Sequence, residues 1–354
     1  MGVFANFRWG VCCVLGAVVV FVSGRVLGCA SEFVSESADT SASPLYRIAF
    51  YNTENYFHPT HDTLKNDYDF TPTGMKGWGS AKFTAKRNNL FKVVAALDAE
   101  VPLLALGLAE VENALVLREL CRGTPLRFLN FDFVHFESPD PRGIDVALLY
   151  RRDLLRVDTA FPIAVAVPPD TVSRTRDILY VKAVCLTDGD TLHFFVNHFP
   201  SKYGGVTATE HKRAYAAGLL RGCMDEVLRN DTAAFVVAMG DLNTGSEDAA
   251  LAVLDSLPWV NLMARPSWKL DRRGQKAGGS HKFRETWSTI DHIIVGQERL
   301  GNIERGKASL FDRDFLLMKD ERYLGYKPLR TFYGAKYLGG YSDHLPVYMD
   351  VWLP

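Results

Sequence analysis

The sequence has almost no net charge and few cysteines, and each shortage counts against a class of protein. Lys and Arg number 40 and Asp and Glu number 41, which gives a formal net charge of −1 at pH 7. The strong basic excess typical of nucleic-acid-binding proteins is absent, although a local basic groove remains compatible with this balance. The six cysteines form no C-x-x-C pair, which argues against a thiolate zinc site. We expect Cys121, Cys185 and Cys223 to be buried thiols.

A comfortable membrane span is also missing, because the apolar run near the N-terminus is too short. Arg8 precedes an uncharged and strongly apolar run from Trp9 to Val22. A membrane-spanning helix needs about 20 apolar residues, so this run suits the core of a signal peptide. Val26-Leu27-Gly28-Cys29 follows and resembles a bacterial lipobox. We therefore predict an exported protein, periplasmic or on the cell surface, that a lipid on Cys29 tethers to a membrane.

Three regions follow from this pattern. Residues 1–28 are predicted to be a signal peptide of the lipoprotein type. Residues 29–44, rich in Ser, Ala, Thr and Glu, have too little apolar content to pack and are predicted to be a flexible tether. Residues 45–354 show no second linker and no repeat, and the chain is 47% hydrophobic, so we expect them to fold around one sizeable core.

Strand-like segments outnumber helix-like segments in this last region. Apolar runs predict strands at 46–51, 103–108, 128–136, 145–150, 161–167, 178–186, 191–197, 233–239, 289–295 and 345–352. Helical spacing predicts helices at 81–97, 113–121, 207–228 and 247–257. Helices that flank so many strands favour two packed sheets with helices outside them.

Polar side chains gather where these strands end, and strand ends are where a rigid scaffold presents catalytic groups. Asn52 follows the first strand, and Glu110 ends a buried strand, where an unpaired carboxylate is costly. A hard cation such as Mg²⁺ would offset that cost, because it prefers carboxylate oxygen. The alternative is a carboxylate that caps the helix beginning at Asn113. Asp145 and His198 also lie at strand ends, where an ordinary ion pair and a surface histidine are the alternatives.

Two further motifs combine acids with an amide or an imidazole. In an extended segment, Asp241 and Asn243 point to the same side, and such a pair handles a proton and binds a phosphate oxygen. The alternative is a turn. Asp291 lies just inside a strand, and Asp343 and His344 open the last one. If that segment is extended, His344 faces a reacting water while Asp343 faces a metal.

The order of these groups resembles the endonuclease/exonuclease/phosphatase superfamily, and most closely its deoxyribonuclease-like members. Gly240-Asp241-Leu242-Asn243 and Ser342-Asp343-His344-Leu345-Pro346 match two specific motifs of that family in the family's order. Phe50-Tyr51-Asn52-Thr53-Glu54-Asn55 is similar to the opening strand of a bacterial exported subgroup. The match runs from about Tyr46 to Trp352. It implies an α+β fold, a four-layer α/β/β/α sandwich with two packed mixed sheets.

The resemblance also implies a role for each candidate residue. One group matches the positions that hold or adjoin a divalent metal, Mg²⁺ or Mn²⁺: Glu110, Asn52 and Asp343. A second group matches the catalytic positions around the scissile phosphate: His344, Asp241, Asn243, Asp291, His198 and Asp145. Within it, His344 accepts a proton from water near neutral pH, and Asp291 orients its ring. Asp145 is expected to pair with His198.

The resemblance thus predicts a metal-dependent phosphoesterase of nuclease type that hydrolyses phosphodiester bonds by His-activated water attack. Seven basic residues lie between 264 and 286, where they either bind a nucleic-acid backbone or form a solvated loop. One alternative is a phosphatase or phospholipase-type esterase acting on lipid or sugar phosphates. The other is a non-catalytic surface lipoprotein. We predict a nucleic acid or another phosphoester as the ligand, and no protein partner.

Overall fold

The computed structural model describes residues 44–168, 175–187, 189–202, 204–264 and 277–353. The predicted signal peptide, Cys29 and residues 30–43 of the predicted tether lie outside these residues. Among the described helices, none combines the length and the apolar character needed to cross a membrane.

Sheet A contains six strands, among them the first strand of the described chain. Its spatial order is β13 (Ser309–Leu310), β18 (Val347–Trp352), β1 (Leu45–Tyr56), β2 (Leu103–Val111), β4 (Asp145–Arg151) and β3 (Phe131–His135). Strands β1 and β2 are parallel, whereas the other neighbouring pairs are antiparallel. The sheet is therefore mixed.

Sheet B also contains six strands and one parallel pair. Its spatial order is β5 (Leu155–Ile163), β6 (Ile178–Cys185), β7 (Thr191–His198), β8 (Phe235–Asp241), β12 (Asp291–Gly296) and β9 (Trp259–Asn261). Strands β7 and β8 are parallel, and all other neighbours are antiparallel. Each sheet thus places one parallel pair near its centre.

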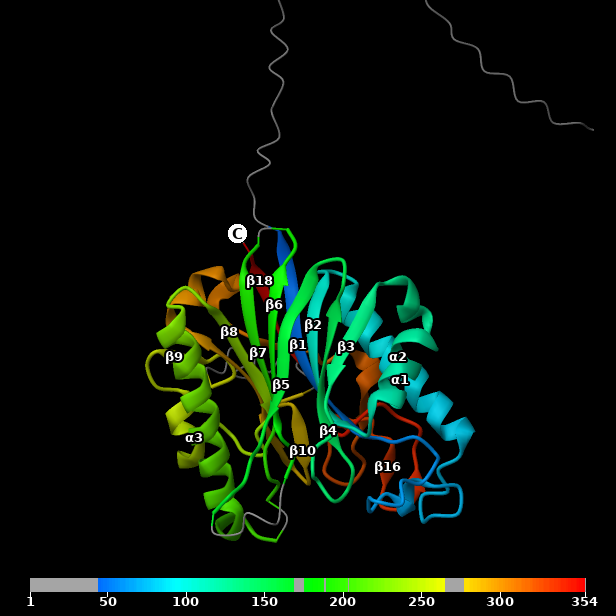
Figure 1. The fold of residues 1–354 in the computed structure, drawn as a ribbon. Coiled ribbons are helices and arrows are strands. Elements are labelled where there is room, and N and C mark those ends of the chain that lie inside the picture. The colour runs from blue at the N-terminus through cyan, green and yellow to red at the C-terminus, as the bar shows by residue number, and fades with distance from the viewer. Residues whose placement is uncertain (1–43, 169–174, 188, 203, 265–276, 354) are drawn as a thin grey trace, which may run out of the picture. The chain divides into compact units, whose positions relative to one another are not determined.

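Three α-helices cover the outer faces of the two sheets (Figure 1). They are α1 (Ser80–Asp98), α2 (Ala114–Arg122) and α3 (Val206–Asn230). Helices α1 and α2 pack with sheet A, and α3 packs with sheet B. In α1 the side chains of Leu90, Val93, Val94 and Leu97 are buried, at the spacing of one helix face. The predicted four-layer sandwich of two mixed sheets is confirmed.

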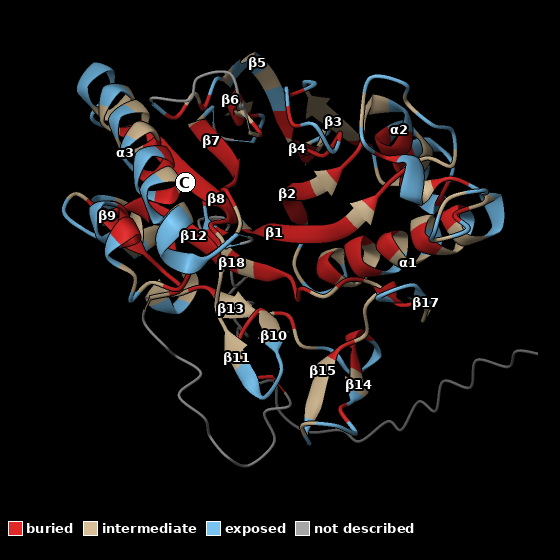
Figure 2. Ribbon diagram, turned by 90° about the horizontal axis from the view of Figure 1, so that it is seen from below, coloured by how far each residue is buried: buried red, intermediate tan, exposed pale blue. Residues whose placement is uncertain are grey.

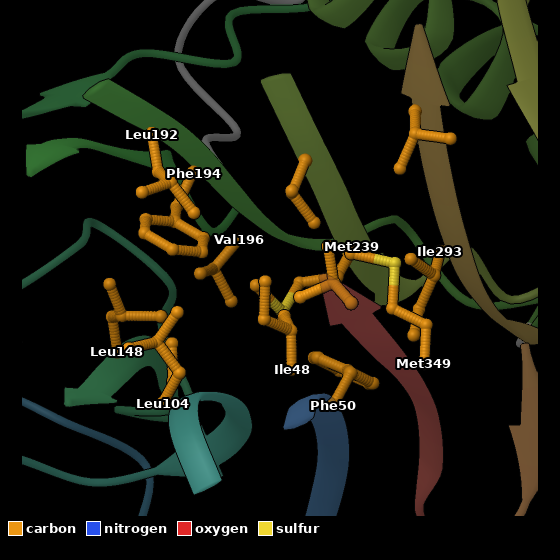
Figure 3. Close-up of a cluster of buried hydrophobic side chains, with 14 of the residues drawn as sticks. Ile48, Phe50, Leu104, Leu148, Leu192, Phe194, Val196, Met239, Ile293 and Met349 are labelled. Atoms are coloured by element: carbon orange, nitrogen blue, oxygen red, sulfur yellow. The ribbon is translucent and has the colours of Figure 1, made fainter. Parts of the chain in front are cut away.

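The main core fills the space between the two sheets (Figure 3). Ile48 and Leu148 of sheet A lie in the same buried cluster as Phe194 of sheet B. A glycine brings the sheets close together: a Cβ atom on Gly107 would lie 2.7 Å from the sulfur of Met239. Real Cβ atoms do not approach other atoms so closely, so a side chain at position 107 would force the Met239 side chain to shift.

Short elements near the C-terminal end of the chain form a region of hairpins (Figure 2). The hairpin strands are β10 (His281–Phe283), β11 (Thr286–Ser288), β14 (Leu317–Lys319), β15 (Tyr326–Pro328), β16 (Phe332–Tyr333) and β17 (Lys336–Tyr337). The 3₁₀ helices of the described chain are Tyr68–Phe70, Pro125–Phe128, Ala249–Leu254, Gln297–Asn302, Glu304–Gly306 and Asp314–Leu316. A buried ion pair of 3.0 Å between Lys282 and Asp320 ties two of these hairpins together.

Some sequence predictions shift in the structure. The strand predicted at 161–167 is displaced, because β5 ends at Ile163. The helix predicted at 247–257 is a shorter 3₁₀ helix, which begins after the N-cap residue Asp248. Cys121 and Cys185 are buried, as predicted, whereas Cys223 is only half-buried.

Candidate active site

Three neighbouring strands of sheet B present candidate residues side by side. The register places His198 at the end of β7 opposite Asp241 at the end of β8. On the other side of β8, the same Asp241 faces Asp291, the first residue of β12. All three side chains are buried. The predicted grouping of acids and a histidine at strand ends is therefore present in sheet B.

Sheet A contributes its residues through irregularities in its parallel strands. The register between β1 and β2 shifts between Asn52 and Tyr56. Glu54 and Asn55 have φ angles of 53° and 52°, and Glu110 on β2 has a φ of 59°. Residues other than glycine rarely adopt this left-handed conformation, and bulges of this kind re-aim side chains next to active sites. The Asn55 backbone N–H donates to Glu110 Oε2 at 2.9 Å, which joins the two irregular segments.

His344 forms the centre of the site, between two carboxylates. Its Nδ1 lies 2.8 Å from Oδ2 of Asp291, which is fully buried. Its Nε2 lies 3.7 Å from Oδ2 of Asp241. The Asp291 contact fixes the ring, as predicted for a carboxylate that orients a catalytic histidine.

The charges in this cluster shift the pKa values of both His344 and Asp241. Burial alone lowers the pKa of His344, but the negative charges of Asp291 and Asp241 outweigh burial and raise that pKa well above its usual value. Burial raises the pKa of Asp241 to about 7, although the charge of His344 opposes that shift. These charges therefore favour the protonated form of His344, whereas the role expected of it requires a ring nitrogen that is free to accept a proton.

His198 has the opposite electrostatic environment. Burial lowers its pKa well below the usual value, and the positive charges of Arg176 and Arg142 lower it further. The ring is therefore neutral at neutral pH. Its Nε2 lies 3.7 Å from Oδ2 of Asp241 in sheet B and 3.9 Å from Oε1 of Glu110 in sheet A. The ring therefore lies between carboxylates of the two sheets.

The two candidate asparagines use their side chains within the protein. Nδ2 of Asn52 donates to Oδ2 of Asp241 at 3.0 Å, and its Oδ1 accepts from the Glu54 backbone N–H at 2.9 Å. Nδ2 of Asn243 donates to the Phe199 carbonyl at 2.9 Å. The φ of Asn243 is 55°, so the segment that begins at Asp241 is a turn. The extended geometry expected for this pair is wrong, and the alternative of a turn holds.

Asp343 lies beside a cation that sequence analysis did not identify. Its Oδ2 accepts from a terminal nitrogen of Arg330 at 2.7 Å. Burial works to raise the pKa of Asp343, but Arg330 and His344 lower it to about 2. Arg330 also donates from Nε to Oε1 of Glu54 at 3.1 Å. One guanidinium therefore joins the carboxylates of two separate segments.

Asp145 does not pair with His198 in the described structure, so that expectation is wrong. Its Oδ2 lies 3.1 Å from Nε2 of His135, and its Oδ1 accepts from the Ser138 backbone N–H at 2.9 Å. The Ser138 hydroxyl makes a further short contact with Oδ1. The carboxyl group of Glu137 also lies beside it, so these contacts hold the segment after β3 against the start of β4.

The donor atoms of the site suit a hard divalent cation. The negative charges of Glu110 and Asp343 both act to raise the pKa values of Arg330 and Lys86. The two carboxylates therefore belong to the same region of the protein. Such cations prefer carboxylate oxygen and often use only one or two protein carboxylates. Glu110 does not cap α2, because Asn113 does so by accepting the Leu115 N–H at 2.9 Å. Glu110 and Asp343 carry the oxygen ligands that such an ion prefers, and Asp343 forms a group with His281 and His344 whose ligand atoms all lie within 4.8 Å of one another.

Sequence reasoning missed three basic or imidazole side chains of this region. Arg330 is described above. Lys86 is buried, donates to the Thr331 hydroxyl at 2.6 Å, and has a pKa lowered by burial to about 8. The His281 ring lies 5.0 Å from the His344 ring, centroid to centroid. No strand-end motif marks these residues, although the helical spacing of α1 places Lys86 on its buried face.

Taken together, the fold and the site define a class. Two packed mixed sheets lie between helices, and buried carboxylates and histidines gather where the strands end. A sequence model described as Endonuclease/Exonuclease/phosphatase family matches residues 47–352. The chain belongs to this family, whose members are generally phosphoester hydrolases.

Solved structures with a similar fold come from bacteria and animals. A mannosyl-6-phosphatase of Bacteroides thetaiotaomicron is 17% identical, with a TM-score of 0.54 over 86% of this chain and 98% of that chain. The human Nocturnin catalytic domain with bound sulfate is 14% identical, with a TM-score of 0.53 over 87% and 94%. A family protein of Bacteroides thetaiotaomicron is 17% identical, with a TM-score of 0.56 over 88% and 96%. No curated protein matches the sequence. At these identities the likeness shows the fold alone.

Proposed function

We propose that this protein is a divalent-metal-dependent phosphoesterase that hydrolyses phosphodiester bonds, with nucleic acid as its substrate class. The observation that carries the proposal is the buried pair of His344 and Asp291, with Asp241 3.7 Å from the imidazole. A purely binding surface has no chemical need for this combination. It therefore counts against the alternative of a non-catalytic surface lipoprotein.

The metal would be held by Glu110 and Asp343, and we propose Mg²⁺ or Mn²⁺. When bound, such an ion stabilises the negative charge that develops on the phosphate oxygens. His198 is neutral because of its burial and its neighbouring arginines, so its imidazole N–H is available to a phosphate oxygen.

The proton is handled by His344 and Asp241. Asp291 holds Nδ1 of His344, which leaves Nε2 directed toward Asp241. The pKa of Asp241 is raised to about 7, so this carboxyl group gains and loses a proton near neutral pH. When the proton on Nε2 passes to Asp241, Nε2 becomes a base that accepts a proton from the attacking water. Protonated Asp241 is then an acid for the leaving oxygen.

One observation favours a second candidate, a phosphatase or phospholipase-type esterase acting on sugar or lipid phosphates. Lys282, from the stretch proposed to bind a nucleic-acid backbone, is buried in its ion pair with Asp320 and is not available to such a ligand. Arg265, Lys269, Arg272, Arg273 and Lys276 of that stretch lie outside the described residues. A mannosyl-6-phosphatase is among the proteins of similar fold.

The test compares substrates at one metal concentration. The purified protein with Mg²⁺ is given plasmid DNA, a phosphomonoester and a phospholipid, beside a His344→Ala control. We expect nicking of the plasmid that stops with EDTA, returns when Mg²⁺ is added in excess, and is lost in the variant. If the well-folded protein cleaves only the sugar or lipid phosphate, the second candidate replaces the first.

We further propose that the protein is exported and tethered to a membrane by a lipid on Cys29. The support is the order of Arg8, the apolar run and the lipobox-like sequence before Cys29. A Cys29→Ser variant expressed in a bacterial host should move from the membrane fraction to the soluble fraction. Equal membrane association of both forms would contradict the lipid anchor.

A further inference from the structure

A small cavity lies between two segments that are far apart in the sequence. Its volume is about 80 Å³, and its lining includes Glu54, Asn55, Phe70, Lys76, Arg330 and Phe332. One water molecule needs about 10–15 Å³ on this scale, so the cavity has room for a group of several heavy atoms. The bulge of β1 and the loop after it form one wall, and the β16 hairpin forms the other.

The cavity adjoins the carboxylates assigned to the metal. The Asn55 backbone N–H donates to Glu110 at 2.9 Å, and Arg330 donates to Asp343 at 2.7 Å. Two lining residues therefore touch the active site directly. A group in the cavity would lie within a short linkage of a phosphate held at Glu110 and Asp343.

Arg330 is held in a fixed orientation at the rim of this cavity. Glu54 accepts from Nε of Arg330 at 3.1 Å and from the Thr331 backbone N–H at 2.6 Å. The Arg330 side chain is still 36% exposed, so it is not enclosed by these contacts. A guanidinium fixed in this way binds phosphate with little loss of side-chain freedom.

Lys76 supplies a second cation from the opposite wall. Its Nζ lies 4.9 Å from the centre of the Phe332 ring and donates to the Gly334 carbonyl at 2.5 Å. Within the described chain, no carboxylate lies within 4.0 Å of this ammonium group. By contrast, the charge of Glu54 is met by Arg330 and by the buried Lys86. The positive charge of Lys76 is therefore available to a ligand.

We propose that this cavity binds a second phosphate group of the substrate, one short linkage away from the phosphate that is cleaved. The proposal rests on the proposed phosphoesterase activity and narrows its substrate class. Phe70 and Phe332 pack against the fully buried Trp78, with ring centres 6.1 Å and 5.8 Å from it, and give the cavity a firm base. The favoured substrate is a short phosphodiester with a terminal phosphate.

The test compares Lys76→Met with Lys82→Met. Lys82 is a matched control: its Nζ lies 5.6 Å from the same Phe332 ring and donates to the Lys76 carbonyl at 2.7 Å, yet Lys82 does not line the cavity. Lys82→Met therefore perturbs the same loop without removing a cation from the cavity. Each protein is assayed on a thymidine dinucleotide with and without a terminal 5′-phosphate, and on bis(p-nitrophenyl) phosphate, which has no second anion.

We expect the wild-type KM to be lower for the phosphorylated dinucleotide. Lys76→Met should raise that KM roughly tenfold, the cost of one lost hydrogen bond to a charged group, and leave the other two substrates unchanged. Lys82→Met should leave all three unchanged, and Lys76→Arg should restore the low KM. A purely structural role of Lys76 would instead reduce kcat on every substrate.

Failure of this inference is distinguishable from failure of the proposed function. Turnover of bis(p-nitrophenyl) phosphate with equal KM values for the two dinucleotides would overturn the phosphate subsite alone. If none of the three substrates is cleaved, inorganic phosphate is titrated calorimetrically into the full-length protein. Binding that is weaker in Lys76→Met but not in Lys82→Met would support the subsite, and equal binding in all three proteins would overturn it.

Discussion

Two histidine–carboxylate pairs in this protein have nearly the same geometry and differ in what surrounds them. His344 and Asp291 are 2.8 Å apart, and His135 and Asp145 are 3.1 Å apart. The exposed fractions of these side chains are 7% and 1% in the first pair and 3% and 1% in the second. Neither distance nor burial separates the pair that we propose to be catalytic from the other one.

The difference lies in the third group that each pair meets. The free side of the His344 ring faces Asp241, and this second carboxylate lies beside His198 of the neighbouring strand β7 and Asn52 of sheet A. Asp145 instead accepts from the backbone N–H and the hydroxyl of Ser138 and lies beside the carboxyl group of Glu137, both in the loop between β3 and β4. In the first pair a ring nitrogen faces the carboxylate of another strand, to which it can transfer a proton, whereas the contacts of the second pair hold a loop in place.

The largest expected difference between the two pairs is the loss of kcat when the histidine of each pair is replaced. His344→Ala should reduce kcat by about 10²–10⁴-fold, because it removes the group that accepts a proton from water. His135→Ala should change kcat by less than about tenfold. Steady-state kinetics on one phosphodiester, with circular dichroism to confirm folding, measures both. A comparable loss of kcat in the two variants would contradict the proposal that only the His344–Asp291 pair takes part in catalysis.

The next effect separates the pairs by stability. Asp145→Asn should lower the free energy of unfolding by about 1–3 kcal/mol, because it weakens several buried hydrogen bonds to the carboxyl group. Urea denaturation followed by tryptophan fluorescence gives this difference. A variant of unchanged stability but abolished activity would show that Asp145 belongs to the active site after all.

A smaller effect concerns the pH dependence of stability in EDTA. The folded-state pKa of His344 is raised above its unfolded value of about 6.5 by Asp291 and Asp241, despite burial. The resulting stabilisation is fully present below pH 6.5 and is lost as the pH rises through the folded-state pKa. The free-energy difference between wild type and His344→Gln should therefore shrink as the pH increases. A difference independent of pH would contradict the proposed charge state of His344.

Much of the fold and part of the site could be predicted from the sequence. Apolar runs predicted the strands that carry Asp241 and Asp291, and the order of acids, amide and histidine along the chain indicated the family. The backbone at Asn243 could not be predicted, because Asn suits both a turn and the spacing of an extended pair.

Contacts between segments that are far apart in the chain also could not be predicted from the sequence. Arg330 and Glu54 are 276 residues apart, and Arg330 lies in an irregular segment where no periodic pattern identifies its neighbours. The prediction that Asp145 pairs with His198 was wrong for a related reason. A strand-end acid needs a partner, but the sequence contains several histidines and does not rank them by distance in space.

The close contact of Gly107 with Met239 has a consequence for the width of the active site. Gly107 precedes Glu110 by three residues on β2, and Met239 precedes Asp241 by two residues on β8. The thickness of the core at this point therefore fixes how far apart the two sheets hold their catalytic groups. A side chain at position 107 would have to displace the Met239 side chain or move the strands apart, and in the second case it would widen the space between the two sets of candidate residues without altering any of them.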